Sequence, residues 1–340
     1  MFARCLSASI GLSLTATTCW AEGAVGFSPF MLDAPHHNKP VETAIWYPAD
    51  TGGTQVTLME NAVFHGTTVQ EDAPIREGQY PVVLLSHGLG GNFYAMGWLA
   101  AGLAERGAIV ITVNHPNSTT RDFDIRAGLD HWTRAHDLRL ALDYLQMTYG
   151  EQLDMTRVMA AGFSYGGWSA LSLAGVTGNL DGYIAHCAEV GAVSTHCADI
   201  ARGGVDMADI SENDWNASYK DARITAVAAI DPGLLYGLSA GSTDDLTTDI
   251  LLIGLGNDTD RLFATDFTPK GNDFAARVPT ADIVTITLAN HFSALLTCKP
   301  AGAAILKSEN DDPVCDDPEG ADRSAIHGEI LDAIAVQLGL

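Results

Sequence analysis

The sequence predicts an α/β fold in which a mostly parallel central sheet is covered by helices on both faces. Short apolar runs rich in β-branched residues alternate with segments whose apolar residues recur at helical spacing, as in strand–helix–strand units. A second observation is the segment 162–166, which reads Gly-Phe-Ser-Tyr-Gly and stands between a buried strand and a helix start. The length of 340 residues suits one such domain with insertions.

Seven strands are expected from their apolar and β-branched composition. In chain order they are 43–47, 82–86, 109–113, 158–163, 224–230, 250–255 and 283–288. Helical patterns lie between several of them. The clearest are 94–106, which stops at Gly107, then 131–149, and finally 323–338 at the end of the chain.

The segment 162–166 places Ser164 at the apex of a sharp turn from strand to helix. A turn this tight strains the backbone of the serine, and glycine on both sides leaves the room that the turn needs. The serine oxygen then stands clear of the sheet, where a histidine and a substrate carbonyl can reach it. An ordinary glycine-rich turn with a solvated serine can show the same Gly-x-Ser-x-Gly pattern. Ser164 is therefore a candidate nucleophile only if the rest of the chain supplies an oxyanion hole, a histidine and an acid.

A candidate oxyanion hole precedes the serine in the chain. The apolar run 81–86 ends in the loop 87–91, which reads His-Gly-Leu-Gly-Gly. A loop at this place supplies one backbone donor in enzymes with a serine turn of this kind, and the residue after the serine, here Tyr165, supplies the second. Two such N–H groups stabilise the oxyanion that forms when the serine attacks a carbonyl carbon.

His291 is the candidate general base. Among the eleven histidines it alone both follows Ser164 and comes directly after an expected strand. His327 falls in the terminal helix, and His186 and His196 fall in an insertion that carries cysteines. The expected order is therefore serine, acid, histidine.

Two aspartates qualify as the acid that orients His291. Asp231 follows the strand 224–230, and Asp258 follows the strand 250–255. Both would stand at the carboxyl edge of a parallel sheet, where ligands bind in open α/β folds. The residues alone leave both candidates open.

Three motifs in order carry a family resemblance. The segments 85–90 (Leu-Ser-His-Gly-Leu-Gly), 162–167 (Gly-Phe-Ser-Tyr-Gly-Gly) and 228–231 (Ala-Ala-Ile-Asp) resemble the plasma-type (group VII) platelet-activating-factor acetylhydrolases of the α/β-hydrolase superfamily. They are also similar to bacterial secreted, dienelactone-hydrolase-like serine esterases. The resemblance extends roughly from Trp46 to His291 and implies an α/β-hydrolase fold with ester hydrolysis through an acyl-enzyme.

Site residues follow from the resemblance position by position. It implies oxyanion donors at Leu89 and Tyr165, and an acid at Asp231, which we favour. In many bacterial relatives and in cutinase-type polyester hydrolases the acid follows the next strand, which would be Asp258. Dienelactone hydrolases use a cysteine where this chain has Ser164, and the insertion at about 175–221, expected to be a cap over the pocket, is longer than theirs.

The N-terminus and the cysteines indicate export. Residues 1–21 combine a lone Arg4, an apolar stretch and a small residue, Ala21, as in a secretory signal peptide. Export to the periplasm or the extracellular space suits disulfides. Four cysteines remain after this segment and allow three pairings; we expect the neighbours to pair, which gives Cys187–Cys197 and Cys298–Cys315.

Net charge and motif spacing argue against several classes of binding partner and cofactor. The net charge of −24 argues against nucleic acid and against anionic membrane surfaces. Neither a metal nor a cofactor is expected, because no Cys-x-x-Cys or His-x-x-x-His spacing occurs. We therefore expect a secreted serine carboxylic ester hydrolase acting on a small-molecule ester, with a short acyl group and a role in lipid degradation implied by the resemblance. Alternatives are a polyester (cutinase-like) hydrolase, an amidase, or a catalytically inactive binding protein on the same fold.

Overall fold

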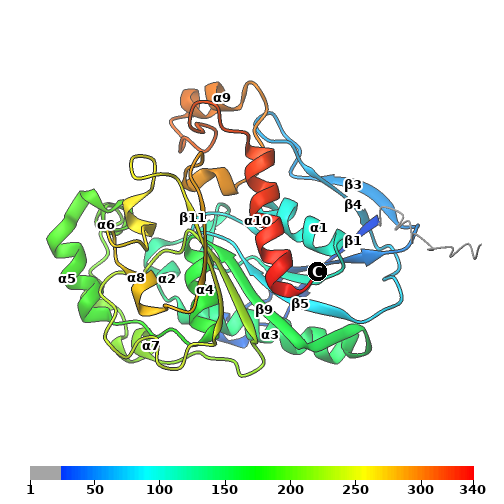
Figure 1. Cartoon of the computed structure of the whole chain (residues 1–340), viewed down its shortest axis with the longest axis horizontal. Helices are drawn as coiled ribbons and strands as arrows, with labels where there is room; N and C mark the ends of the chain where they lie inside the picture. Colours follow the sequence, from blue (N-terminus) through cyan, green and yellow to red (C-terminus); the bar gives the residue numbers. More distant parts are fainter. Residues whose placement is uncertain (1–23) are drawn as a thin grey trace, which may run out of the picture.

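A ten-stranded sheet forms the centre of the computed structural model, which describes residues 24–340 (Figure 1). The expected signal peptide, with Arg4 and Ala21, lies outside the described residues. The strand order is β12-β11-β10-β9-β5-β6-β2-β1-β4-β3. The first six strands in that order run parallel to one another: β12 (Asp282–Ile286), β11 (Asp249–Leu255), β10 (Ala226–Ile230), β9 (Leu153–Phe163), β5 (Tyr80–Ser86) and β6 (Ile109–Val113).

The other end of the sheet is mostly antiparallel. There β2 (Val41–Ala49) pairs antiparallel with both β6 and β1 (Ala24–Leu32). The hairpin of β3 (Thr54–Leu58) and β4 (Thr67–Glu71) continues the sheet, with β4 parallel to β1. The expected α/β class and mostly parallel sheet are confirmed. All seven expected strands are present, whereas β1, β3 and β4 were not expected.

Helices cover both faces of the sheet and create two cores. On one face, α1 (Gly97–Glu105) and α10 (Arg323–Leu338) pack over side chains such as Val83. On the other, α3 (Trp132–Tyr149) and α4 (Tyr165–Ala174) pack over side chains such as Val82. Neighbouring residues of one strand enter opposite cores because side chains alternate across a sheet.

Two segments outside this layered core each contain a disulfide. The first holds α5 (Leu180–Val190), α6 (Thr195–Arg202) and α7 (Glu212–Asn216), and Cys187–Cys197 joins α5 to α6. The second holds α9 (Gly302–Glu309) between Cys298 and Cys315, which form the other disulfide. Figure 1 shows the first segment at one end of the molecule and α9 above the start of α10. Within residues 24–340, no helix is long and apolar enough to cross a bilayer.

Candidate active site

Ser164 stands at a strained turn between β9 and α4. Its backbone has φ 56° and ψ −118°, a conformation that costs a non-glycine residue on the order of 1–3 kcal/mol. The flanking glycines are required sterically. A Cβ on Gly162 would lie 2.2 Å from the carbonyl oxygen of Gly166, and a Cβ on Gly166 would lie 2.0 Å from the carbonyl oxygen of Ser86. The turn therefore forms only with these two glycines, as the sequence pattern predicts.

His291 lies between Ser164 and Asp231. The ring belongs to the 3-10 turn His291–Ala294, which follows β12. Its Nε2 is 3.1 Å from Oγ of Ser164, and its Nδ1 is 2.7 Å from Oδ2 of Asp231. The ring of Phe163 packs against the imidazole with centroids 4.6 Å apart. This geometry lets an Nδ1–H tautomer donate to the carboxylate while Nε2 accepts from the serine hydroxyl.

Backbone and side-chain donors hold the Asp231 carboxylate. Asp231 follows β10 and is completely buried. Its Oδ1 accepts a hydrogen bond from the N–H of Leu255 at 3.0 Å, and its Oδ2 accepts one from the hydroxyl of Thr265 at 2.9 Å. Asp258, the other candidate acid, is exposed instead and forms an ion pair with Lys270 at 2.5 Å. The structure thus brings Asp231 to His291, and it gives Asp258 a different partner.

Two backbone N–H groups beside Ser164 are free to bind an oxyanion. The loop after β5 approaches the serine so closely that a Cβ on Gly88 would lie 3.4 Å from Cβ of Ser164. The N–H of Leu89 in this loop has no hydrogen-bond partner within residues 24–340. The N–H of Tyr165, the first residue of α4, has no acceptor inside its helix, as at every helix start.

His87 fixes the orientation of this loop. Its Nε2 accepts the N–H of His115 at 3.1 Å, so the ring proton sits on Nδ1, which donates to the carbonyl of Gly88 at 2.7 Å. Burial, with the nearby Arg134 charge, holds the pKa of His87 well below its usual value, so the ring is neutral. In a trans peptide the N–H points opposite to the C=O. The N–H of Leu89 therefore points away from the His87 ring.

A buried arginine supports the same loop from beneath. Arg134 on α3 donates to the carbonyl oxygen of His87, to Oγ of Ser86 at 3.2 Å and to Oγ of Ser169 at 2.8 Å. Its guanidinium also lies 4.4 Å from the ring centroid of Tyr165. Burial lowers the pKa of Arg134 to about 10, which leaves it charged at neutral pH. The sequence pattern gave no signal for this residue, because an arginine inside an amphipathic helix is usually exposed.

A cavity of about 300 Å³ opens beside Ser164 and His291. Its walls are largely apolar, and its rim carries the carboxylates of Asp311 and Asp312. The apolar lining comes mainly from the β3–β4 hairpin loop and from the segment after His291, including Met59, Phe64, Phe292, Leu295, Leu296 and Leu306. Its size is at the lower end of the range for small-molecule sites. A second cavity, of about 700 Å³, shares Met59, Asn92 and Thr120 with it.

The insertion expected to cap the pocket does not line this cavity. None of its residues, 175–221, is among the described residues that form the walls. It approaches the site from another side through His196 of α6, whose ring would lie 2.8 Å from a Cβ on Gly233. Burial lowers the pKa of His196 to about 4, and the proximity of His291 adds to this shift. The described walls of this cavity therefore come from the two segments named above, and a covering role of 175–221 stays a prediction.

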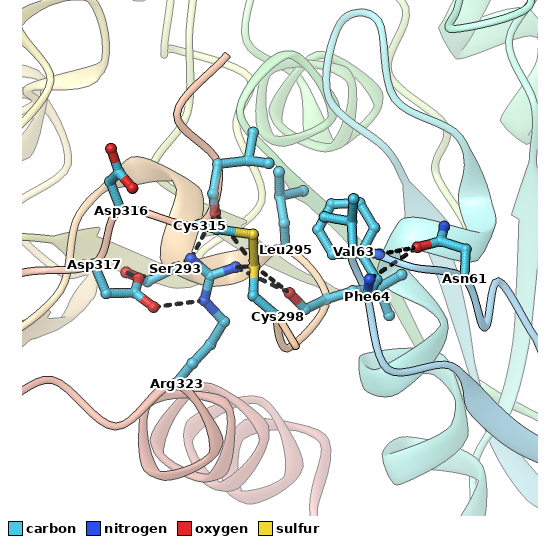
Figure 2. Close-up of a disulfide and its surroundings, with 12 residues drawn as sticks. Asn61, Val63, Phe64, Ser293, Leu295, Cys298, Cys315, Asp316, Asp317 and Arg323 are labelled. Atoms are coloured by element: carbon cyan, nitrogen blue, oxygen red, sulfur yellow. Dashed lines mark hydrogen bonds and ion pairs between the residues drawn. A yellow bond between two sulfur atoms is a disulfide. The ribbon is translucent and has the colours of Figure 1, made fainter. Parts of the chain in front are cut away.

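A disulfide and a buried arginine hold the cavity wall that follows His291. Figure 2 shows Arg323, at the start of α10, beneath the Cys298–Cys315 disulfide. Arg323 donates to the carbonyl of Leu296 at 2.9 Å and to that of Val314 at 2.6 Å. These two residues lie on the two chain segments that the disulfide joins. The disulfide and the hydrogen bonds of the guanidinium therefore both hold this loop in place.

Asp317 connects Arg323 to the histidine loop. Nε and Nη2 of Arg323 donate to the carboxylate of Asp317 at 2.9 and 2.8 Å (Figure 2). The same carboxylate accepts the hydroxyl of Ser293 at 2.6 Å. Ser293 also caps the turn that carries His291, by accepting the N–H of Asn290 at 3.0 Å. The position of the imidazole is thus tied to the ion pair behind it.

Comparisons with known proteins agree with the observed fold. A family model described as platelet-activating factor acetylhydrolase, isoform II, matches residues 54–123, which include the 87–91 loop but not Ser164, Asp231 or His291. A ferulic acid esterase from Streptomyces cinnamoneus is 17% identical over 95% of this chain and 91% of its own, with a TM-score of 0.60. No curated protein matches the sequence significantly.

A second solved structure has the same architecture. A dienelactone hydrolase-like promiscuous phosphotriesterase from metagenomic libraries is 17% identical over 93% of this chain and 98% of its own, with a TM-score of 0.52. At this level of identity the two structures show the fold alone. The chain has the α/β-hydrolase fold, and the expected resemblance to that superfamily is confirmed.

Proposed function

We propose that this protein is an exported serine carboxylic ester hydrolase. The observation that carries the proposal is the chain of contacts from Ser164 Oγ through His291 to Asp231, at 3.1 and 2.7 Å, beside a mostly apolar cavity. A hydroxyl, an imidazole and a buried carboxylate in this order are what nucleophilic acyl transfer requires.

The proposed reaction has two stages. Oγ of Ser164 attacks the ester carbonyl while Nε2 of His291 takes its proton, and Asp231 stabilises the resulting imidazolium. The N–H groups of Leu89 and Tyr165 bind the oxyanion, and each such donor lowers the barrier by about 3–4 kcal/mol. His291 then returns the proton to the leaving alcohol, and water releases the acyl group by the same steps.

The proposed substrate is a small ester with a short acyl group. The cavity of about 300 Å³ beside Ser164 supports a small acyl portion, and the adjoining cavity of about 700 Å³ leaves room for a larger alcohol portion. We also propose that residues 1–21 are a signal peptide and that the rest is one α/β-hydrolase domain with an insertion at about 175–221. The two disulfides support an oxidising compartment, periplasmic or extracellular.

Hydrolysis of p-nitrophenyl esters, from acetyl to long-chain acyl, tests the proposal. The wild-type protein should favour the short esters, and Ser164→Ala should lose the activity while keeping the same circular dichroism spectrum and melting temperature. A fluorophosphonate probe should label wild type and leave Ser164→Ala unlabelled. Activity that survives in Ser164→Ala would refute the nucleophile. A wild-type protein that neither hydrolyses esters nor takes the label would be a binding protein on this fold.

A further inference from the structure

The turn between β1 and β2 brings two histidines to one buried carboxylate. His36 and His37 belong to the 3-10 turn Pro35–His37, which packs against α3. Their Nε2 atoms lie 2.8 and 3.0 Å from the same oxygen, Oδ1 of Asp137 on α3. The three ligand atoms all lie within 4.8 Å of one another. Side chains from two distant parts of the chain therefore converge on one point.

Within residues 24–340, no lysine or arginine contacts the buried carboxylate of Asp137 directly. Its side chain is 0% exposed, and its hydrogen-bond and ion-pair partners within residues 24–340 are all histidines. The third of them, His115, contacts Oδ2 through Nδ1 at 2.8 Å. Arg134, one turn earlier on α3, directs its guanidinium to the loop after β5 instead. Buried carboxylates are normally paired with a cation or bound to a metal.

The geometry points to a Zn²⁺ site formed by His36, His37 and Asp137. Two imidazole nitrogens and one carboxylate oxygen are a donor set that zinc accepts, with water in the fourth tetrahedral position. Zinc bonds of about 2.0–2.1 Å at tetrahedral angles place neighbouring ligand atoms about 3.4 Å apart. The observed separations of 2.8 and 3.0 Å need to widen only slightly. Ca²⁺ and Mg²⁺ prefer oxygen ligands and do not match this set.

The surroundings provide both access and support for the ion. The side chain of His36 is 23% exposed, whereas that of His37 is 5% exposed, so zinc enters from the His36 side. His115 holds the second oxygen of the carboxylate, as outer partners of metal ligands commonly do. The ion would clamp the β1–β2 turn onto α3. Sequence spacing gave no signal for the site, because His36 and Asp137 are 101 residues apart.

Zinc titration of the chelator-treated, dialysed protein tests this site. Isothermal titration calorimetry with ZnCl₂ should give one ion per chain, and zinc should raise the melting temperature. His36→Gln and His37→Gln should each weaken binding by more than the roughly 10–100-fold that loss of an outer partner costs. His65→Gln is the matched control, because His65 is an exposed histidine in the β3–β4 loop and should leave binding unchanged.

Three results would overturn the zinc site. The absence of zinc binding by wild type would assign the cluster to histidine–carboxylate hydrogen bonding alone. Equal binding by wild type and His36→Gln would place the ion elsewhere on the acidic surface, and equal binding of CaCl₂ would mean an unselective site. His36 is partly exposed, so His36→Gln decides the question even if His37→Gln fails to fold. None of these readouts depends on ester hydrolysis.

Discussion

Removing the Cys298–Cys315 disulfide should change acyl-chain selectivity as well as stability. The cross-link closes a loop with a sequence separation of 17 residues, so its loss should cost about 3 kcal/mol of unfolding free energy in the chain-entropy treatment. For a chain of this length that corresponds to a fall in melting temperature of roughly 4–5 °C. The loop supplies cavity-lining residues, including Leu306, so loosening it should let longer acyl groups enter.

The other disulfide provides a matched control. Cys187–Cys197 has a separation of 10 residues, so its loss should cost a similar amount, about 2.7 kcal/mol. It lies in the 175–221 insertion, which does not line the cavity within the described residues. Any displacement of the neighbouring His196 should scale the rates for all esters alike and leave their ratios unchanged.

The assay is the ratio of kcat/KM for a long-chain ester to that for the acetyl ester, measured with purified double serine variants. Cys298→Ser with Cys315→Ser should raise this ratio, whereas Cys187→Ser with Cys197→Ser should leave it at the wild-type value. Melting temperatures should fall in both variants. If both lose stability and both keep the wild-type ratio, the disulfide does not shape the acyl pocket, and the reasoning from the cavity wall is refuted.

Three further predictions concern the acid, the response to pH and the charge of the substrate. Asp231→Asn should lower kcat by about ten-thousand-fold through the wrong histidine tautomer, and Asp258→Asn should have little effect; comparable losses in both would contradict the assignment of the acid. Burial lowers the pKa of His131 to about 3 and that of His327 to about 4. The unfolded chain therefore binds more protons than the folded chain between these values and about 6.5, so stability is full above pH 6.5 and falls as the pH drops, by up to about 1.4 kcal/mol per pH unit per histidine. Urea unfolding at several pH values checks this, and the free energy of unfolding of His327→Gln should fall less steeply with decreasing pH than that of wild type. A wild-type free energy of unfolding that stays constant from pH 7 to 5 would contradict it. The acidic rim should disfavour an ester carrying a carboxylate, and Asp312→Asn should improve its kcat/KM by roughly fivefold relative to a neutral ester, the effect of about 1 kcal/mol of repulsion; an unchanged ratio would remove Asp312 from substrate selection.

Burial explains which strands the sequence predicts. The seven expected strands include all those of the parallel region, and neighbouring residues there, such as Val82 on one face of the sheet and Val83 on the other, are both buried. A strand covered on both faces reads as a continuous apolar run. The hairpin β3–β4 reads differently, because most residues of Thr54–Leu58 are exposed and polar. Such strands are set by pairing with their neighbours, which local composition does not reveal.

The same reasoning explains why the residues alone leave the choice between Asp231 and Asp258 undecided. Asp231 and Asp258 both follow parallel strands, so sequence order treats them alike. Their difference arises from contacts across β11: the N–H of Asp231 donates to the carbonyl of Ile253 at 2.7 Å, and Oδ1 accepts the N–H of Leu255. These bonds hold Asp231, at a positive φ of 47°, beneath His291. Local composition cannot report bonds between residues more than twenty positions apart.

The pocket walls depend most on long-range pairing. Phe64 in the β3–β4 loop forms an isolated antiparallel bridge with Cys298, and backbone hydrogen bonds from His65 to Thr297 and from Lys299 to Val63 flank it. Backbone hydrogen bonds therefore join the two walls of the cavity directly. Neither wall contains a catalytic motif, so the motifs that predict the chemistry say nothing of these walls. We therefore expect substitutions at residues 59–65 and 295–315 to change substrate choice while the turn at Ser164 and the position of His291 stay the same.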